Sequence, residues 1–380
     1  MKPEYIELNY SDEGPSYIRK DRIDEIKKID VIVFDCDGVL LDVRLSYKNA
    51  VSKTSSILIE AFTGYKIPED FFDDKLYFSY KKTGGFNNDW THTYAYVMKT
   101  LSELPPSTLQ KIDSISRKSL KFHKPAERLD FIQQNQVETN IDEQQLYMSL
   151  LAFTKNLDSS GVESVDRELI PITGENVKKA LNYRADVGES IVSTLFEEIF
   201  GGAELFRETF GVEPQFIEEK KGLVENNYVI LKKETLQGIR KLIGKRVGIA
   251  SSSLANTACH SLGDIIDNFS EDSMVWHDNV DIAMRETGRN DLHKPNPYPL
   301  LRASKPYNPY NMVLYVGDTM ADKIMARKTR EMEKKFLFAG VYGASSLPEE
   351  SKQAFMEEKS DIVTPSVNEL PLILLEIRNE

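Results

Sequence analysis

The sequence has little cysteine and no long apolar run. Its two cysteines, Cys36 and Cys259, can form neither a disulfide framework nor a four-cysteine zinc site within one chain. No stretch approaches 18 consecutive apolar residues, so we expect no membrane-spanning helix. The polar, acidic start of the chain lacks the apolar segment of a secretory signal. Together these absences predict a cytoplasmic protein.

Positive charge is scarce relative to negative charge. The chain has 48 Lys and Arg residues against 60 Asp and Glu residues, which gives a formal net charge of −12. Such a chain lacks the basic surface that nucleic-acid binding needs, and an anionic membrane would repel it. The five histidines show neither HExxH nor His-x-Glu spacing, so the sequence predicts no zinc site. We expect neither nucleic acid nor a membrane as a partner.

Short apolar runs predict the strands of a parallel sheet. The first run lies at 31–34, and similar runs follow at 247–250, 312–316 and 336–341. A last run at 362–363 is expected to form an edge strand. From residue 226 onward these runs alternate with helical patterns, which is typical of βαβ units. The expected fold class is therefore α/β, with a Rossmann-like parallel sheet.

A long segment with only helical periodicity separates the first strand from the others. Helices are predicted at 51–62, 92–104, 107–123, 141–157 and 187–200. The pair Asp186 and Glu189 has the spacing of a capping box that opens the last of these helices, and Gly201 is expected to end it. The segment predicts an all-helical domain inserted into the α/β domain.

These patterns divide the chain of 380 residues into three parts. Residues 1–29 are expected to form an N-terminal extension packed on the core. Residues 30–45 and 226–380 form the predicted α/β core domain, and residues 46–225 form the helical domain inserted after the first strand. This division agrees with the two or three domains expected for the length.

Acidic residues follow two of the predicted strands. Asp35 and Asp37 come directly after the first strand, and Gly38 allows the backbone to turn there. Asp318 follows the strand at 312–316, and Asp322 lies one helical turn further on. The carboxyl ends of parallel strands are where open α/β sheets bind ligands, and carboxylate oxygens suit Mg²⁺. Read alone, each pair could also be an ordinary acidic turn.

Two further segments carry phosphate-binding chemistry. Ser251 and Ser252 follow the strand at 247–250, where hydroxyls and backbone N–H groups could hold a phosphate oxygen. Lys294 lies between His293 and Pro295 in a proline-rich turn. Each has a plain alternative, because serines commonly cap helices and a lysine beside proline is commonly a solvated loop residue.

The four motifs occur in the order of the haloacid dehalogenase superfamily. The sequence resembles its phosphohydrolase branch, with the helical cap inserted after the first strand, as in subfamily I. The match covers about residues 29–43 and 226–365. The stretch 84–90, together with Leu205-Phe206 and Trp276-His277-Asp278, also resembles a subgroup of uncharacterised archaeal and cyanobacterial phosphatase-like proteins.

The resemblance implies a role for each motif in hydrolysing a small phosphorylated metabolite. Asp35 would be the nucleophile that forms an aspartyl-phosphate, and Asp37 the general acid and base. The implied cofactor is Mg²⁺, held by the Asp35 carboxylate, the Asp37 backbone carbonyl and Asp318.

The remaining implied roles concern orientation and charge. Asp322 would orient a metal-bound water from outside the ligand sphere. Ser251 and Ser252 would hold a phosphoryl oxygen, and Lys294 would balance the charge on the nucleophile and the phosphoryl group.

The segment 84–90 combines two glycines, two amides, a carboxylate and two aromatics. We interpret it as a specificity loop in which Asn87 and Asn88 bind substrate hydroxyls. The alternative is a turn between helices with an Asn or Asp cap.

Two other functions remain open from the sequence. A phosphomutase would use the same aspartates and metal, and a ligand-binding protein without activity could share the fold. The intact Asp35, Asp37, Lys294 and Asp318 argue against the latter.

Overall fold

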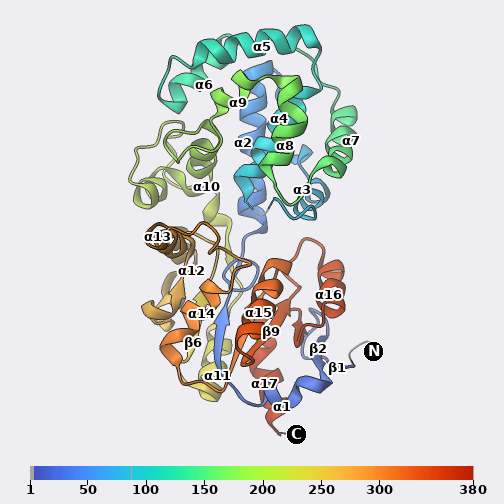
Figure 1. Ribbon diagram of the computed structural model, residues 1–380, viewed down its shortest axis with the longest axis vertical. Coiled ribbons are helices and arrows are strands. Elements are labelled where there is room, and N and C mark those ends of the chain that lie inside the picture. The colour runs from blue at the N-terminus through green and yellow to red at the C-terminus, as the bar shows by residue number, and fades with distance from the viewer. Residues whose placement is uncertain (1–3, 87, 380) are drawn as a thin grey trace. The chain divides into compact units, whose positions relative to one another are not determined.

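The computed structural model describes residues 4–86 and 88–379. They form two compact units (Figure 1). One, here called the α/β unit, contains the described residues up to Arg44 and those from Asn227 onward. The other, the helical unit, is Leu45–Asn226. Among the described residues, no helix has both the length and the apolar character needed to cross a membrane.

The α/β unit is built on an eight-stranded sheet with the order β1-β2-β10-β9-β8-β3-β6-β7. Neighbouring strands from β10 to β7 are all parallel, whereas β1 and β2 are antiparallel additions at one side. The strands are β1 Tyr5–Leu8, β2 Ser16–Arg19, β3 Ile29–Phe34, β6 Val247–Ala250, β7 Met274–Val275, β8 Met312–Gly317, β9 Phe336–Val341 and β10 Ile362–Thr364. A separate pair, β4 Leu41–Asp42 and β5 Tyr228–Val229, is antiparallel. The predicted α/β fold with a mostly parallel sheet is confirmed.

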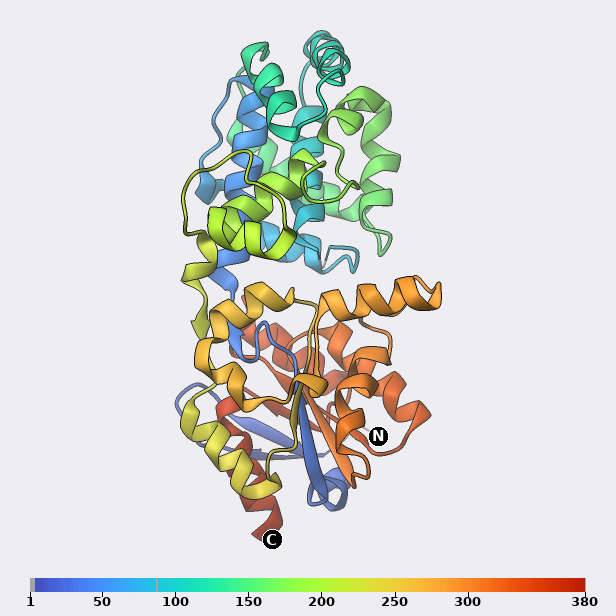
Figure 2. The same cartoon turned by 90° about the vertical axis from the view of Figure 1, so that its left-hand side faces the viewer.

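Helices cover both faces of this sheet (Figure 2). The inner strands β6, β8 and β9 are buried along their whole length, because a parallel sheet in an α/β protein is covered on both faces. One face packs against α1 Ile23–Ile26, α11 Lys233–Ile243, α12 Ala255–Leu262 and α17 Leu370–Asn379. The other packs against α13 His277–Thr287, α14 Tyr298–Ser304, α15 Met320–Met332 and α16 Pro348–Glu357.

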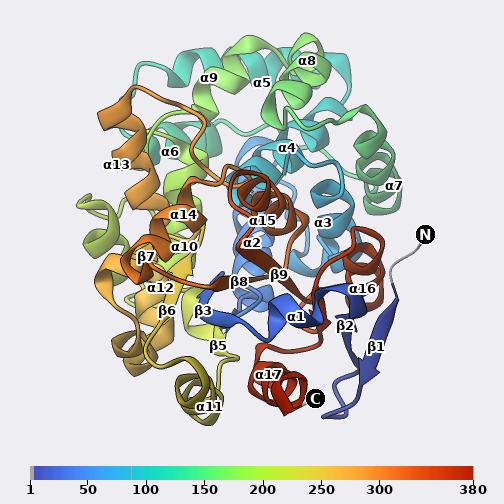
Figure 3. The same ribbon diagram turned by 60° about the horizontal axis from the view of Figure 1, so that its bottom comes forward.

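The N-terminal extension adds strands to the sheet (Figure 3). In β2, Ile18 pairs with Ile362 of β10, and β1 pairs with the outer side of β2. The prediction that 362–363 forms an edge strand is therefore wrong. Its neighbour comes from the opposite end of the chain, and β2 is too short and mixed in composition to be recognised as a strand from its sequence.

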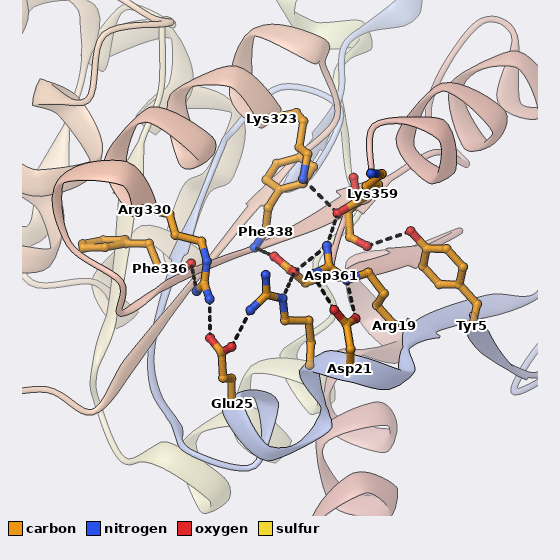
Figure 4. A network of polar contacts seen from close by, with 12 residues as sticks. Tyr5, Arg19, Asp21, Glu25, Lys323, Arg330, Phe336, Phe338, Lys359 and Asp361 are labelled. Atoms are coloured by element: carbon orange, nitrogen blue, oxygen red, sulfur yellow. Dashed lines mark hydrogen bonds and ion pairs between the residues drawn. The ribbon is translucent and has the colours of Figure 1, made fainter. Parts of the chain in front are cut away.

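A polar network anchors the extension (Figure 4). The buried Asp361 carboxylate lies 3.4 Å from guanidinium nitrogens of both Arg19 and Arg22, and it accepts the Phe338 backbone N–H at 3.0 Å. Glu25 makes an ion pair with Arg330 at 2.6 Å. Because buried charges need several partners, this network fixes the extension to β9 and β10.

The helical unit consists of helices and turns, and none of its described residues belongs to a strand. Its helices are α2 Arg44–Thr63, α3 Asp74–Lys81, α4 Asp89–Ser102, α5 Pro106–Ser119, α6 Pro125–Gln134, α7 Glu143–Phe153, α8 Val162–Thr173, α9 Glu175–Leu181 and α10 Ile191–Phe210. Four of them, α3, α6, α8 and α9, were not predicted. The helices α3, α6 and α9 are short, and short periodic segments give a weak sequence signal. The helix α8 contains Pro171, a residue that commonly ends a helix.

The start of α10 differs from the predicted capping box. Ser190 is the N-cap, and its hydroxyl accepts the Ser193 N–H at 3.2 Å. Asp186 instead closes a turn, because its carbonyl accepts the N–H groups of Glu189 and Ser190 at 3.0 Å. The helix kinks at Gly202, one residue after the predicted end, where the backbone has φ 74°. Asp186 and Ser190 are both residue types that can cap a helix. Ser190, which directly precedes the first residue of α10, is the one that does so.

Candidate active site

The predicted site residues meet at one edge of the sheet because their strands are in register. Phe34 at the end of β3 pairs with Val316 of β8 on one side and with Ile249 of β6 on the other. The residues that follow these strands therefore emerge together at the carboxyl edge. The Asp35 N–H also donates to the Val316 carbonyl at 2.8 Å, which holds the first aspartate beside β8.

Lys294 bridges two buried carboxylates. Its Nζ lies 2.8 Å from Oδ1 of Asp35 and 2.9 Å from Oδ1 of Asp322. The side chain of Lys294 is 7% exposed, that of Asp35 is 10% exposed and that of Asp322 is fully buried. The Asp35 Oδ1 also accepts the Cys36 N–H at 2.8 Å. Among the described residues no hydrogen bond reaches Oδ2 of Asp35, so this oxygen is available to react or to bind a ligand.

Asp322 is held by hydrogen bonds at both of its oxygens. Oδ1 accepts from Lys294 and from the Tyr315 hydroxyl at 2.8 Å. Oδ2 accepts from the Thr319 hydroxyl at 2.6 Å and from the Thr319 N–H at 3.1 Å. A buried carboxylate needs hydrogen bonds to both of its oxygens, and Asp322 has them. We infer that Asp322 positions Lys294 and does not itself react.

Asp318 completes a group of three carboxylates. One oxygen of each of Asp35, Asp318 and Asp322 lies within 4.8 Å of the others. The cluster contains three carboxylates and one lysine, so it keeps an excess of negative charge. Hard oxygen ligands with this charge suit a divalent cation such as Mg²⁺. The donor set of the site therefore fits the metal that the resemblance implies.

Asp37 is linked to the loop after β6. Its Oδ2 accepts the Ser253 hydroxyl at 2.9 Å, and the Ser253 and Ser251 hydroxyl oxygens are 2.9 Å apart. Ser251 and Ser253 are buried, whereas Ser252 is exposed. The structure thus links Ser251 to Asp37 through Ser253, and Ser252 is not part of this chain of hydrogen bonds.

The charges of the cluster shift the pKa values of its members. Burial and the neighbouring Asp322 raise the pKa of the Asp35 carboxyl. Burial acts in the same direction on Asp322, but the adjacent Lys294 ammonium holds its pKa below the ordinary value. Although burial opposes its charge, Asp322 and Asp35 together raise the pKa of Lys294. Lys294 is therefore a permanent cation between the two carboxylates.

Three residues of this cluster were not predicted. Tyr315 lies inside β8, where an aromatic residue gives no functional signal in the sequence. Ser253 is the third of three consecutive serines, and only burial separates it from Ser252. Thr319 did carry a signal, since Thr319 and Asp322 have the spacing of a capping box and form one at the start of α15.

The predicted specificity loop lies in the helical unit. The Asn88 side chain is the N-cap of α4 and accepts the Trp90 N–H at 2.8 Å. This is the structural role given above as the alternative, and binding of substrate by Asn88 stays a prediction. Asn87 lies outside the described residues.

Comparisons with known proteins agree with this geometry. A family model described as haloacid dehalogenase-like hydrolase matches residues 29–329, a range that begins with β3 and contains the whole carboxylate and lysine cluster. No curated protein matches the sequence significantly.

Several solved structures resemble the chain. The X-ray structure of a Northeast Structural Genomics Consortium target is 18% identical, covers 92% of this chain and 100% of its own, and has a TM-score of 0.65. At that identity the likeness shows the fold alone. A phosphatase, Tt82 from Thermococcus thioreducens, is 18% identical, with coverages of 86% and 98% and a TM-score of 0.48. A hydrolase from Pseudomonas syringae is 14% identical, with coverages of 92% and 99% and a TM-score of 0.36.

Proposed function

The chain belongs to the haloacid dehalogenase-like hydrolase family, and on that premise we propose that it is a magnesium-dependent phosphatase acting on a small phosphorylated metabolite. The observation that carries this proposal is the arrangement around Asp35. Lys294 and the Cys36 N–H both bind its Oδ1, so Oδ2 is oriented as a nucleophile. Asp37 follows two residues later with its carboxylate held by Ser253.

In the first step, Oδ2 of Asp35 attacks phosphorus. An oxygen–phosphorus bond forms, the bond from phosphorus to the leaving oxygen breaks, and the leaving oxygen takes a proton from the Asp37 carboxyl. The Lys294 ammonium offsets the negative charge of Asp35 and of the phosphoryl group. When bound by Asp35, Asp318 and the Asp37 carbonyl, Mg²⁺ supplies further charge neutralisation at the phosphoryl oxygens.

In the second step, Asp37 takes a proton from water as the water attacks the aspartyl-phosphate. The bond between Asp35 and phosphorus breaks, which releases inorganic phosphate and restores both carboxyl groups to their starting states. Ser251 and Ser252, with the backbone N–H groups of their loop, would hold a phosphoryl oxygen. Asp322 would keep Lys294 in place and orient a metal-bound water.

We assign substrate choice to the helical unit, acting as a cap that contributes Asn87 and Asn88. The membership of the archaeal and cyanobacterial subgroup, the cytoplasmic location, and the lack of nucleic-acid or membrane partners stay predictions.

A phosphate-release screen over phosphorylated metabolites with Mg²⁺ tests the activity. Borohydride reduction during turnover tests the intermediate, because it converts an aspartyl-phosphate to homoserine. Mass spectrometry should then find homoserine at position 35 and aspartate at position 37. Homoserine at another position, or at none, would contradict Asp35 as the nucleophile. Conversion of a sugar phosphate to its isomer without free phosphate would instead identify a phosphomutase.

A further inference from the structure

A second group of metal-ligating side chains lies on the α/β unit, apart from the carboxylate cluster. It consists of His277 and Asp281 on α13 and of His293 in the segment that follows this helix. One ligand atom of each residue lies within 4.8 Å of the others. In the mechanism proposed above, none of the three has a role. We propose that these residues form a binding site for one transition-metal ion of the Zn²⁺ class.

The distances suit such an ion. The Nε2 atom of His277 lies 3.5 Å from Oδ2 of Asp281. The Nε2 atom of His293 makes a 2.8 Å hydrogen bond to Oδ1 of Asp281, which a bound ion would replace by a small movement of the His293 ring. Zinc bonds of about 2.0–2.1 Å in tetrahedral geometry place neighbouring ligand atoms roughly 3.4 Å apart. His277 and Asp281 are four residues apart on one helix, so they share a face, and His293 approaches the same carboxylate from outside the helix.

The donor set separates this site from the predicted magnesium site. Two imidazole nitrogens and one carboxylate favour Zn²⁺ and its neighbours among the transition metals, whereas the all-oxygen cluster of Asp35, Asp318 and Asp322 favours Mg²⁺. Three protein ligands leave a fourth position of a tetrahedral ion open to water. The two sites should therefore be filled by different metals.

The three side chains are accessible from solvent. The side chains of His277, Asp281 and His293 are 36%, 42% and 32% exposed, so an ion can enter from solvent. The imidazole rings are stacked with centroids 4.3 Å apart, and rotation of these partly exposed rings would aim both nitrogens at one ion. Burial and the neighbouring His293 lower the pKa of His277, which keeps it neutral and able to bind a metal.

The site has a direct backbone connection to the active-site loops. The His277 N–H donates to the Ser253 carbonyl at 3.1 Å, and His293 immediately precedes Lys294. In Figure 3, α13 starts where the chain leaves β7, and its far end leads to the segment before α14. An ion bound by both histidines would therefore tie the loop of Ser253 to the segment that carries Lys294. We expect it to stabilise the α/β unit, since a ligand bound only by the folded state raises stability.

The test measures Zn²⁺ bound to the full chain at saturating Mg²⁺. After chelation, incubation with Zn²⁺ and dialysis against buffer without Zn²⁺, the wild-type protein should hold one Zn²⁺ per chain by elemental analysis. The His277→Ala/His293→Ala variant should hold none. The Asp281→Asn variant should bind at least about tenfold more weakly, because even outer-shell changes cost about 10- to 100-fold in metal affinity. Zn²⁺ should raise the Tm of the wild-type protein but not that of the double-histidine variant.

Two controls identify the site. His123→Ala, which removes an exposed histidine of the helical unit, should leave the Zn²⁺ content unchanged. Asp35→Asn/Asp318→Asn should also keep it, since the proposed site does not use these carboxylates. If the double-histidine variant does not fold, imidazole ¹H–¹⁵N spectra of the wild-type chain decide instead, and the signals of His277 and His293 should shift with Zn²⁺. No Zn²⁺ bound to the wild type, Zn²⁺ retained by the folded double variant, or unshifted signals would each overturn the proposal.

Discussion

Gly38 and Asp318 approach so closely that position 38 has no room for a side chain. A Cβ atom at Gly38 would lie 2.0 Å from Oδ2 of Asp318, and the backbone there has φ +73°, which L-amino acids rarely adopt. The backbone of the turn after β3 therefore packs against the Asp318 carboxylate of the turn after β8. This contact places Asp318 beside the Asp35 loop, where the predicted metal site needs it.

Gly38→Ala should therefore remove activity by displacing Asp318. Gly244→Ala is a matched control, because Gly244 has φ +72° but no atom within 4 Å of a Cβ. Each variant should lose about 1 kcal/mol of stability from the unfavourable backbone conformation. Only Gly38→Ala should lose phosphate release at the Mg²⁺ concentration that saturates the wild type, and any activity left should need a higher Mg²⁺ concentration. Similar activity in the two variants would show that the position of Asp318 is not critical.

Asp35→Asn should abolish turnover without unfolding the protein. An amide is a poor nucleophile and a weaker metal ligand, so both functions of the residue fail together. Phosphate release and Tm should be measured together with those of Asp42→Asn, in which the changed residue pairs with Arg44 and has no proposed role in the reaction. We expect Asp42→Asn to remain active. If Asp35→Asn kept more than about a tenth of the wild-type rate, another residue would have to be the nucleophile.

Activity should require Mg²⁺, and Mn²⁺ should be able to replace it. The reason is that the proposed ligands, the carboxylates of Asp35 and Asp318 and the backbone carbonyl of Asp37, are all hard oxygen donors. Treatment with EDTA should abolish phosphate release, and added Mg²⁺ should restore it. Full activity in a thoroughly chelated sample would contradict the metal assignment.

Glu197 should make the stability of the helical unit depend on pH. It is buried and accepts the Trp90 indole N–H at 2.8 Å, and burial raises its pKa from 4.5 to about 8. Between these values the folded state holds a proton that the unfolded state has released. The free energy of unfolding should therefore fall as pH rises, by up to about 1.4 kcal/mol per pH unit.

Glu197→Gln isolates this effect because glutamine keeps an acceptor for Trp90 but does not ionise. Urea unfolding near pH 5 and above pH 8 should show the variant gaining stability relative to the wild type as pH rises. A constant difference between the two proteins over this range would mean that Glu197 is not protonated in the folded state.

The substrate role of the loop before α4 can be separated from its capping role. Asn88→Ala should cost about 1 kcal/mol of stability through loss of the cap, whereas Asn88→Ser keeps an acceptor for the Trp90 N–H. Asn87→Ala combined with either change should weaken transition-state binding of the metabolite found by screening by about 1–3 kcal/mol. Hydrolysis of a generic aryl phosphate should barely change. Equal losses on both substrates would leave the loop with a structural role only.

Local patterns in the sequence determined the architecture and the catalytic edge of the sheet. Short apolar runs located β3, β6, β8 and β9, since strands buried on both faces must be apolar throughout. Because the carboxyl ends of parallel strands share one edge, the aspartates after β3 and β8 could be expected to meet there. The sequence also predicted the turn at Gly38, because glycine tolerates a positive φ.

Only the tertiary structure decided which side chains join that edge from a distance. Tyr315, in the buried strand β8, donates a hydrogen bond to Asp322. Ser253 and not Ser252 donates to Asp37, because the Ser253 side chain is buried beside it whereas that of Ser252 is exposed. The pairing of β2 with β10 joins the two ends of the chain, and His293 meets Asp281 across the turn after α13. Such contacts depend on long-range packing, which residue type and spacing do not encode locally.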